Sequence, residues 1–280
     1  MKKPRIGFQG ELGAFSQEAV QKLLGDAAVV VPYQRFEDVF KSLDAGETDA
    51  SVIPIENTLH GSVHENYDHL LNYNVRIVAE TNVRIVHNLI APVGVRLKDV
   101  RRAFSHPVAL NQCLDFFVRH PNVEKSTFYD TAGSVRMVVN EGLRDAAAIA
   151  SSVAAEIYGA HILKRSIEDD RRNFTRFFLL NTKKKRVLPP QPTSPVWKTS
   201  LVFSTSNTPG SLFRSMSAFA LRDLNLTKIE SRPLRGKPWE YLFYLDFNGS
   251  EGEEKVQNAL RHLQELADFL RVLGSYPEGD

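Results

Sequence analysis

A basic, proline-rich segment divides the chain at residues 183–195. It begins with four basic residues, 183–186, and ends with four prolines in the seven positions 189–195. Proline lacks a backbone N–H and restricts φ, so such a segment cannot lie inside a helix or a central strand and is typical of a semi-rigid linker. The chain must therefore fold as one module before this segment and another after it. We expect a first domain at 1–182, a linker at 183–197 and a second domain at 198–280.

The composition is typical of a water-soluble globular protein, with 42% hydrophobic and 24% charged residues and a net charge of +2. The charges are well mixed, so we expect neither nucleic-acid nor membrane binding, and we interpret the basic run as solvated linker. Cys113 is the single cysteine, which excludes an internal disulfide and favours inert packing over a reactive thiol. No apolar leader follows Met1 and no apolar run has membrane-spanning length, so we expect a cytoplasmic protein.

The first domain alternates short apolar runs with segments of helical periodicity, the pattern of a parallel sheet covered by helices. Two such runs, joined by extended segments at 75–91, predict a two-lobed α/β clamp with a cleft. The first lobe takes about 1–80 and 161–182, and the second lobe about 81–160. The expected strands are 5–8, 29–33, 51–55, a strand ending at 104, 126–129, 146–150 and a strand through 175, and the expected helices of the second lobe are 109–118, 131–141 and 151–158.

The second domain shows a compact pattern of alternating strands and helices. Pro209 opens its first helix, at a position where proline is already in helical conformation. The order is strand, helix, strand, strand, helix, strand, which predicts the ferredoxin-like βαββαβ plan. The expected strands are 201–203, 226–231, 241–247 and 270–273, and the second helix carries its apolar face between 256 and 267.

Thr175 and Arg176 form a polar pair inside the apolar block 173–180, which is otherwise typical of a buried strand. A buried arginine is costly unless an anion meets it. The pair therefore indicates a contact with an anionic ligand. The alternative is an edge strand whose arginine pairs with Asp169 or Asp170.

Other polar residues follow the expected strands, where ligands collect in open parallel sheets. The loop 10–16 contains two glycines and opens a helix, so it is either a tight turn or an anion cradle. Glu56, Asn57 and Thr58 end the third strand, where Asn57 or Thr58 could also cap the next helix. Further hydroxyl and amide groups follow later strands. They are Ser105, Gln112 and Thr131.

Two stronger chemical readings are rejected. Ser105 and His106 are adjacent and lack the G-x-S-x-G elbow of a hydrolase, so we do not expect a serine nucleophile. The spacing of His60 and His64 would suit two metal ligands on one helix face, but no pattern of supporting residues accompanies it, so we interpret His60, His64 and His69 as a solvated polar face. We expect a pocket for a small, multiply anionic molecule that needs no metal and no cofactor.

Five motifs in the first domain resemble, in order, those of the prephenate dehydratase family. Two motifs of the second domain resemble its ACT regulatory domain. The resemblance covers essentially the whole chain and implies a catalytic domain of the type II periplasmic-binding-protein-like fold. The motifs are Gly10-x-x-Gly13-x-Phe15-Ser16, Pro54-Ile55-Glu56-Asn57, Ser105-His106-Pro107, Asp130-Thr131-Ala132, Thr175-Arg176-Phe177, Pro209-Gly210-Ser211-Leu212 and Glu230-Ser231-Arg232-Pro233.

The resemblance implies a carbon–oxygen lyase of L-phenylalanine biosynthesis that converts prephenate to phenylpyruvate by decarboxylative dehydration. It implies that the Thr175 hydroxyl assists the leaving group and that Arg176 pairs with a substrate carboxylate. Glu56 is either a proton source or a partner of Arg176. The remaining residues would bind and orient the substrate. They are Asn57, Ser105, Gln112 and Thr131.

The resemblance also implies feedback inhibition by L-phenylalanine and a homodimer or homotetramer. The chain has Gly210-Ser211-Leu212-Phe213 where the family has Gly-Ala-Leu-Val, and the extra bulk of Phe213 leaves the strength of inhibition open. Two other functions remain: an arogenate dehydratase that makes phenylalanine directly, and a non-catalytic amino-acid-sensing binding protein. The implied effector residues are Asn207, Pro209, Gly210, Ser211, Leu212, Glu230, Ser231 and Arg232.

Overall fold

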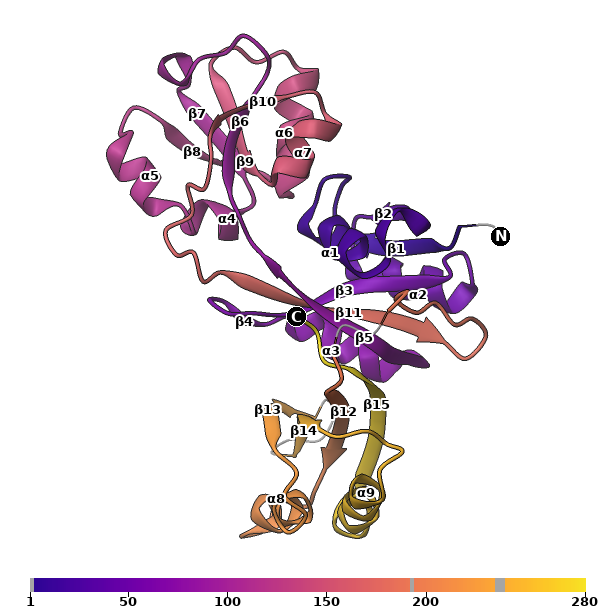
Figure 1. Cartoon of the computed structure of the whole chain (residues 1–280). Helices are drawn as coiled ribbons and strands as arrows, with labels where there is room; N and C mark the ends of the chain where they lie inside the picture. The colour runs from indigo at the N-terminus through magenta and orange to yellow at the C-terminus, as the bar shows by residue number, and fades with distance from the viewer. Residues whose placement is uncertain (1–2, 192–193, 235–239) are drawn as a thin grey trace.

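The computed structural model describes residues 3–191, 194–234 and 240–280 (Figure 1). Two α/β lobes and a C-terminal module follow one another in space, with the second lobe at the top of the figure and the module at the bottom. The α/β prediction and its two lobes are confirmed. No helix in the described ranges is long and apolar enough to cross a membrane.

Lobe 1 is built on a sheet of order β2-β1-β3-β11-β5, with β4 paired to β3. The first three strands of this order are parallel, and β11 runs antiparallel to both β3 and β5. Helix α1 covers one face of the sheet, whereas α2 and α3 pack on the other. The elements are β1 (Arg5–Gln9), α1 (Phe15–Leu24), β2 (Val29–Tyr33), α2 (Phe36–Ala45), β3 (Ala50–Asn57), β4 (Gly61–Ser62), α3 (His64–Asn72), β5 (Val75–Arg84) and β11 (Phe174–Thr182).

Lobe 2 has a sheet of order β10-β6-β9-β7-β8 between two helical layers. The strand at 161–164 belongs to this sheet, and β5 stays in lobe 1 up to Arg84, so the expected lobe boundaries move by a few residues. The helix expected at 109–118 is two short helices. The elements are β6 (Asn88–Ala91), β7 (Arg102–Ser105), α4 (Pro107–Asn111), α5 (Leu114–Arg119), β8 (Glu124–Thr127), α6 (Thr131–Asn140), β9 (Ala146–Ala150), α7 (Ser152–Ile157) and β10 (His161–Lys164).

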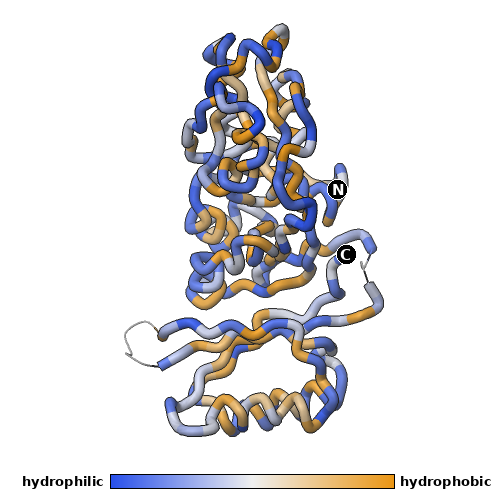
Figure 2. Tube along the Cα trace, turned by 90° about the vertical axis from the view of Figure 1, so that its left-hand side faces the viewer, coloured by the Kyte–Doolittle hydropathy of each residue, from blue (hydrophilic) through white to orange (hydrophobic). Residues whose placement is uncertain are grey.

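The C-terminal module is an antiparallel sheet of order β13-β14-β12-β15. Its element order matches the expected βαββαβ plan. One sheet face packs on α8 and α9, and the other faces lobe 1, so the sheet lies between the two (Figure 2). The elements are β12 (Trp197–Ser204), α8 (Ser211–Ala220), β13 (Leu226–Pro233), β14 (Tyr241–Asn248), α9 (Glu254–Leu266) and β15 (Phe269–Pro277).

The module and lobe 1 share one hydrophobic core. Val202, Tyr244 and Leu273 of the module lie in the same cluster as Ile77 and Phe178 of lobe 1. At Gly274 an added Cβ would lie 2.1 Å from the Ile77 carbonyl oxygen, so only glycine allows β15 to approach β5 this closely. The module is therefore fused to lobe 1 by packing, although a linker joins the two in sequence.

Candidate active site

A cavity of about 450 Å³ lies between the lobes. It is lined by the ends of strands and the starts of helices from both lobes, as expected for a doubly covered α/β fold. The residues around it are neutral or aromatic apart from histidines and one carboxylate. They are Gln9, Phe15, Phe36, Pro54, Asn57, His60, Gly61, Ser62, Val63, Ile85, His87, His106, Val108, Ala109, Gln112, Tyr129, Asp130, Thr131, Thr175 and Phe177.

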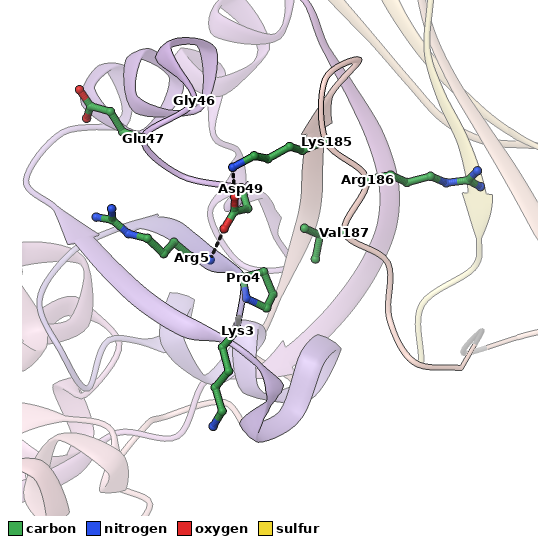
Figure 3. Close-up of a pocket in the computed structure, with 9 residues that line it drawn as sticks. All are labelled: Lys3, Pro4, Arg5, Gly46, Glu47, Asp49, Lys185, Arg186 and Val187. Atoms are coloured by element: carbon green, nitrogen blue, oxygen red, sulfur yellow. Dashed lines mark hydrogen bonds and ion pairs between the residues drawn. The ribbon is translucent and has the colours of Figure 1, made fainter. Parts of the chain in front are cut away.

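A second hollow, of about 520 Å³, opens near the N-terminus and the start of the linker (Figure 3). Its centre is Asp49, which accepts hydrogen bonds from the Lys185 ammonium and from the Arg5 backbone N–H. The basic side chains around this pair are exposed, and Arg186 points away from it. The solvated ion pair between Lys185 and Asp49 holds the start of the linker against lobe 1. Among the described residues that line this hollow, the polar side chains do not converge on one point where a ligand could bind.

Thr175 places a nearly buried hydroxyl in the cleft between the lobes. It lies on β11 directly opposite Asn57 on β3. The Asn57 amide nitrogen donates to Thr175 Oγ1 at 2.9 Å and to Asn173 Oδ1 at 2.8 Å. Since Oγ1 is the acceptor in this bond, the hydrogen of the Thr175 hydroxyl remains available to another acceptor.

The orientation of the Asn57 amide follows from the backbone around it. Its oxygen Oδ1 accepts hydrogen bonds from the N–H groups of Leu59 and His60, both at 3.0 Å. A backbone N–H can only donate, so the amide nitrogen has to face Thr175. The turn after β3 thereby fixes the polarity of the Asn57–Thr175 pair.

The positive partial charge in this cleft comes from helix N-termini and not from lysine or arginine side chains among the described lining residues. Phe15 at the start of α1 and Thr131 at the start of α6 both line it, and the described lining includes no lysine or arginine. The first N–H groups of a helix have no partner within the helix and attract anions. Asp130 caps α6 through Gly133 N at 2.7 Å, and burial raises the pKa of its carboxyl group.

The loop before α1 connects the two lobes. Glu11 accepts hydrogen bonds from Tyr129 Oη at 2.7 Å and from Arg136 at 2.8 Å. The Gly13 carbonyl accepts a bond of 2.7 Å from Ser151 Oγ. An added Cβ at Gly13 would lie 2.6 Å from Ala154 Cα, so the glycine is needed for this close approach. The loop expected to be either a turn or an anion cradle is thus also a lobe–lobe contact.

Four of the seven expected catalytic residues line the cleft: Asn57, Gln112, Thr131 and Thr175. The structure places the other three elsewhere. The Ser105 side chain is fully buried and donates to the Ile149 carbonyl at 2.6 Å, which fastens β7 to β9 and turns the hydroxyl away from His106. Glu56 and Arg176 point to the opposite face of the sheet because side chains alternate along β3 and β11.

Arg176 lies in a carboxylate network at the junction with the C-terminal module, which corrects its expected contact with substrate. Its guanidinium contacts Asp246 at 2.6 Å, Glu80 at 2.6 Å and Tyr276 Oη at 3.2 Å. Burial alone lowers the pKa of Arg176, but Asp246 and Glu80 raise it well above its ordinary value. Glu56 is 4.0 Å from Arg176 and 3.0 Å from Lys228, and Asp169 and Asp170 are not the partners.

The cleft includes residues that the sequence did not single out. His87 is buried, is 2.7 Å from Gln112, and makes an edge contact with the Phe15 ring. His60, rejected above as a metal ligand, lies 3.1 Å from Gln112. Asn173 stands beside Asn57. The histidines give no period or motif of their own, and only the meeting of segments far apart in the chain brings them together.

The two expected effector motifs occupy the same end of the module sheet. Leu242 of β14 pairs with Ser204, which leads to residues 207–212, and with Arg232. Glu230 and Arg232 face lobe 1: Glu230 accepts a hydrogen bond from Ser62 and pairs with His64 at 3.1 Å. Arg232 pairs with Asp68 at 3.4 Å. Ser231 is exposed, and residues 207–210 are exposed before α8.

Two α/β lobes around a neutral, hydroxyl-bearing cleft define a clamp for a small polar ligand. A family model described as "Prephenate dehydratase" matches residues 6–185. The chain belongs to the prephenate dehydratase family, and is thereby a dehydratase of the prephenate and arogenate class.

Relatives and solved structures are similar over almost the whole chain. "Arogenate dehydratase/prephenate dehydratase 2, chloroplastic" of Arabidopsis thaliana is 45% identical over 98% of this chain and 72% of its own length. The structure of prephenate dehydratase in complex with L-Phe from Arthrobacter aurescens is 31% identical, with a TM-score of 0.87 over 98% of this chain and 89% of that one. A structure described as GqqA, a novel type of quorum-quenching acylase, is also 31% identical, with a TM-score of 0.88 over 98% of both chains.

The expectation of a cytoplasmic protein is contradicted by the names of these relatives. Several of the Arabidopsis thaliana relatives are named chloroplastic, and this finding overturns the expectation. The expectation rested on the residues after Met1. Since this chain covers 72% of the length of the 45% identical relative, its first residues carry no information on a leader.

Proposed function

We propose that the protein converts prephenate to phenylpyruvate, carbon dioxide and water. The bond from the ring to its carboxylate breaks, and its electron pair moves into the ring, which becomes aromatic. The 4-hydroxyl leaves with one proton from solvent as water. The observation that carries this proposal is the Thr175 hydroxyl in the cleft. Asn57 donates a hydrogen bond to the hydroxyl oxygen of Thr175, so the hydroxyl hydrogen of Thr175 is not used in that bond.

Thr175 would donate that hydrogen to the leaving hydroxyl. Threonine is a weak acid, so we assign it hydrogen-bond donation rather than complete proton transfer. The bond strengthens as negative charge develops on the departing oxygen, and an interaction that is stronger in the transition state than in the ground state accelerates the reaction.

The neutral lining suits a substrate that loses a carboxylate. A guanidinium on the departing carboxylate would stabilise the ground state more than the transition state, in which the charge moves into the ring. The apolar wall of Phe15, Ile85 and Phe177 would accommodate the ring and the departing carboxylate. The N-terminus of α1 would hold the carboxylate that is retained.

Incubation with prephenate and, in parallel, with arogenate tests the activity. We expect phenylpyruvate and carbon dioxide from prephenate. A purified, folded protein that consumes neither compound would end the proposal, and the non-catalytic binding protein would then be favoured.

Arogenate is a second candidate substrate, since several relatives are named arogenate dehydratases. It carries an ammonium group where prephenate carries a ketone. Asp130 is the one carboxylate among the described lining residues and would be its natural partner. The ratio of kcat/KM for the two compounds decides which one is preferred.

We infer that the C-terminal module is an ACT-type regulatory domain and that L-phenylalanine inhibits the enzyme by binding beside residues 207–212. Gly210 precedes α8 with a φ of 78°, which favours glycine, and leaves the helix N-terminus exposed. The hydrogen bond that the Ser62 hydroxyl donates to Glu230 would pass the effector state to lobe 1. Deleting the module would expose the shared core, so point variants provide the better test.

Gly210→Ala should weaken inhibition by L-phenylalanine, because the new Cβ is strained at this φ and meets Arg214 at 3.3 Å. Gly252→Ala is the matched control, since Gly252 has no positive φ and its nearest neighbour is 3.8 Å away. An uninhibited wild-type protein, or equal inhibition of both variants, would remove the effector site from this loop.

We also propose a homodimer or homotetramer formed through the module. Phe213 of α8 and Leu221, the residue that caps the end of α8, are 77% and 75% exposed, and large exposed apolar side chains favour an interface. Light scattering of the purified protein gives the oligomeric state, and a monomer at micromolar concentration would contradict the proposal.

A further inference from the structure

A row of hydrogen bonds crosses the cleft through the Gln112 side chain. Gln112 Oε1 lies 2.7 Å from His87 Nε2. Gln112 Nε2 lies 3.1 Å from His60 Nδ1. All three residues line the cavity that also contains Thr175.

The polarity of this row follows from the amide. The amide oxygen faces His87 Nε2 and the amide nitrogen faces His60 Nδ1. An amide oxygen only accepts and an amide nitrogen only donates, so this arrangement requires a hydrogen on His87 Nε2 and an acceptor at His60 Nδ1. Burial lowers the pKa of the His87 imidazole, which favours its neutral form. His87 Nδ1 is accordingly left as an acceptor, and it is buried without a partner in the described structure. Neutral His60 carries its hydrogen on Nε2.

The row joins three parts of the molecule. His87 lies in the crossover between β5 and β6, Gln112 ends α4 in lobe 2, and His60 lies in the turn before β4 in lobe 1. Glu168 of the returning crossover accepts from His87 N and from Arg84, both at 3.0 Å. His87 is 2% exposed, and its backbone N–H ties together the two segments that connect the lobes. These two segments can be followed in Figure 1, between β5 and β6 and between β10 and β11.

We propose that His87 is a positioning residue of the dehydratase reaction, which fixes the Gln112 amide and, through it, the tautomer of His60. Without the His87 N–H, the Gln112 amide would be free to rotate, and His60 could present either nitrogen to the cleft. With it, Gln112 and His60 both direct N–H donors of fixed orientation toward an anionic substrate. This inference rests on the proposed function.

A double-mutant cycle in the full-length protein tests the coupling. His87→Phe should lower kcat about tenfold with a smaller change in KM, the effect of one lost oriented hydrogen bond. His87→Gln keeps an N–H donor near the position of Nε2 and should stay within about threefold of wild type. In the Gln112→Ala background, His87→Phe should cost less than about twofold, because the group that it positions is already absent.

His120→Phe is the matched control. His120 stacks on Phe116 in lobe 2 with ring centroids 4.4 Å apart and is not among the cavity residues. Its effect should be the same with and without Gln112. If His87→Phe is equally costly in both backgrounds, or if the Gln and Phe variants of His87 are equally impaired, His87 supports only the packing and the proposal is overturned.

Nitrogen-15 NMR of the histidine rings tests the positioning without activity. We expect the Nε2–H tautomer at His87 and His60 in the wild type, and a mixture at His60 in Gln112→Ala. An Nδ1–H tautomer at His87, or an unchanged His60 in the variant, would contradict the proposal. If the protein consumes neither prephenate nor arogenate, the proposed function fails, and these spectra still decide whether the row exists.

Discussion

The two faces of β11 carry opposite chemistry. On the cleft face, Thr175 lies among amides, histidines, aromatic rings and helix N-termini. On the other face, Arg176 joins Glu80 and Asp246 in a network that also contains Lys198. Adjacent residues of one strand thus serve different tasks, because a strand directs successive side chains to opposite sides.

The difference teaches where charge is useful in this molecule. At the junction with the module the charged groups are permanent, and each meets a protein partner that compensates for its burial. In the cleft Asp130, which caps α6, is the one carboxylate among the described lining residues, and the N-terminus of α1 supplies partial positive charge to a ligand. The sequence suggested that the Arg176 guanidinium binds the ligand, but in the structure it binds Glu80 and Asp246 instead.

Thr175→Ala should have the largest effect on the cleft face. We expect kcat to fall by about 10²–10³-fold with little change in KM, because the donor to the leaving group is lost while substrate contacts remain. Thr175→Ser keeps a hydroxyl and should retain most of the activity. Steady-state kinetics and denaturant unfolding of both variants check this, and near-wild-type turnover of the alanine variant would remove Thr175 from the mechanism.

Arg176→Leu should reveal the junction face. It leaves two buried carboxylates short of a partner, so we expect the free energy of unfolding to fall by about 3–5 kcal/mol while kcat of the folded protein changes far less. Arg176→Leu combined with Asp246→Asn should recover part of the stability. A stable Arg176→Leu protein that has lost turnover would return the guanidinium to the active site.

Asp130→Asn should change the choice of substrate. Asparagine can still accept the Gly133 N–H that caps α6, but it has no charge for an ammonium group. We expect kcat/KM for arogenate to fall about ten- to hundredfold relative to that for prephenate, the value of one charge-assisted contact. An unchanged ratio would show that another group distinguishes the two compounds.

Glu18→Gln should have the smallest effect, and on stability alone. Burial on α1 raises the pKa of Glu18 to about 7, and a hydrogen bond with Ser151 partly opposes this. Between its unfolded value of 4.5 and about 7, the folded protein holds a proton that the unfolded chain has lost, so Glu18 reduces stability as pH rises through this window.

The Gln variant should therefore gain stability over wild type at pH 8 and differ little at pH 5, as measured by urea unfolding. Glu156→Gln on the exposed side of α7 serves as the control. The same difference between Glu18→Gln and wild type at both pH values would contradict the assignment.

Much of the fold could be predicted because its signals are local. Apolar periods and turn residues predicted the two lobes and the βαββαβ order of the module. The strands β4 and β10 and the helix α3 were not predicted, and the helix expected at 109–118 is broken between α4 and α5. Asn57 and Thr175 lie on adjacent strands of the lobe 1 sheet, and Gln112 and Thr131 lie at the ends of helices that follow strands of the lobe 2 sheet, so their meeting in a cleft between the lobes could be expected. Ser105 also stands at the end of a strand, but its hydroxyl donates a hydrogen bond to the Ile149 carbonyl on β9. The Ser105 side chain is therefore buried and does not line the cleft.

The sequence alone determined the order of the motifs, the family to which they belong and the presence of a hydroxyl on the strand that begins at the cleft. Only the tertiary structure decided the role of Arg176, since its partner Asp246 is 70 positions away and no local pattern reports it. The same holds for the row from His87 to His60, which exists only where the lobes meet. Periodicity shows that a strand has two faces, whereas long-range packing selects what each face contacts.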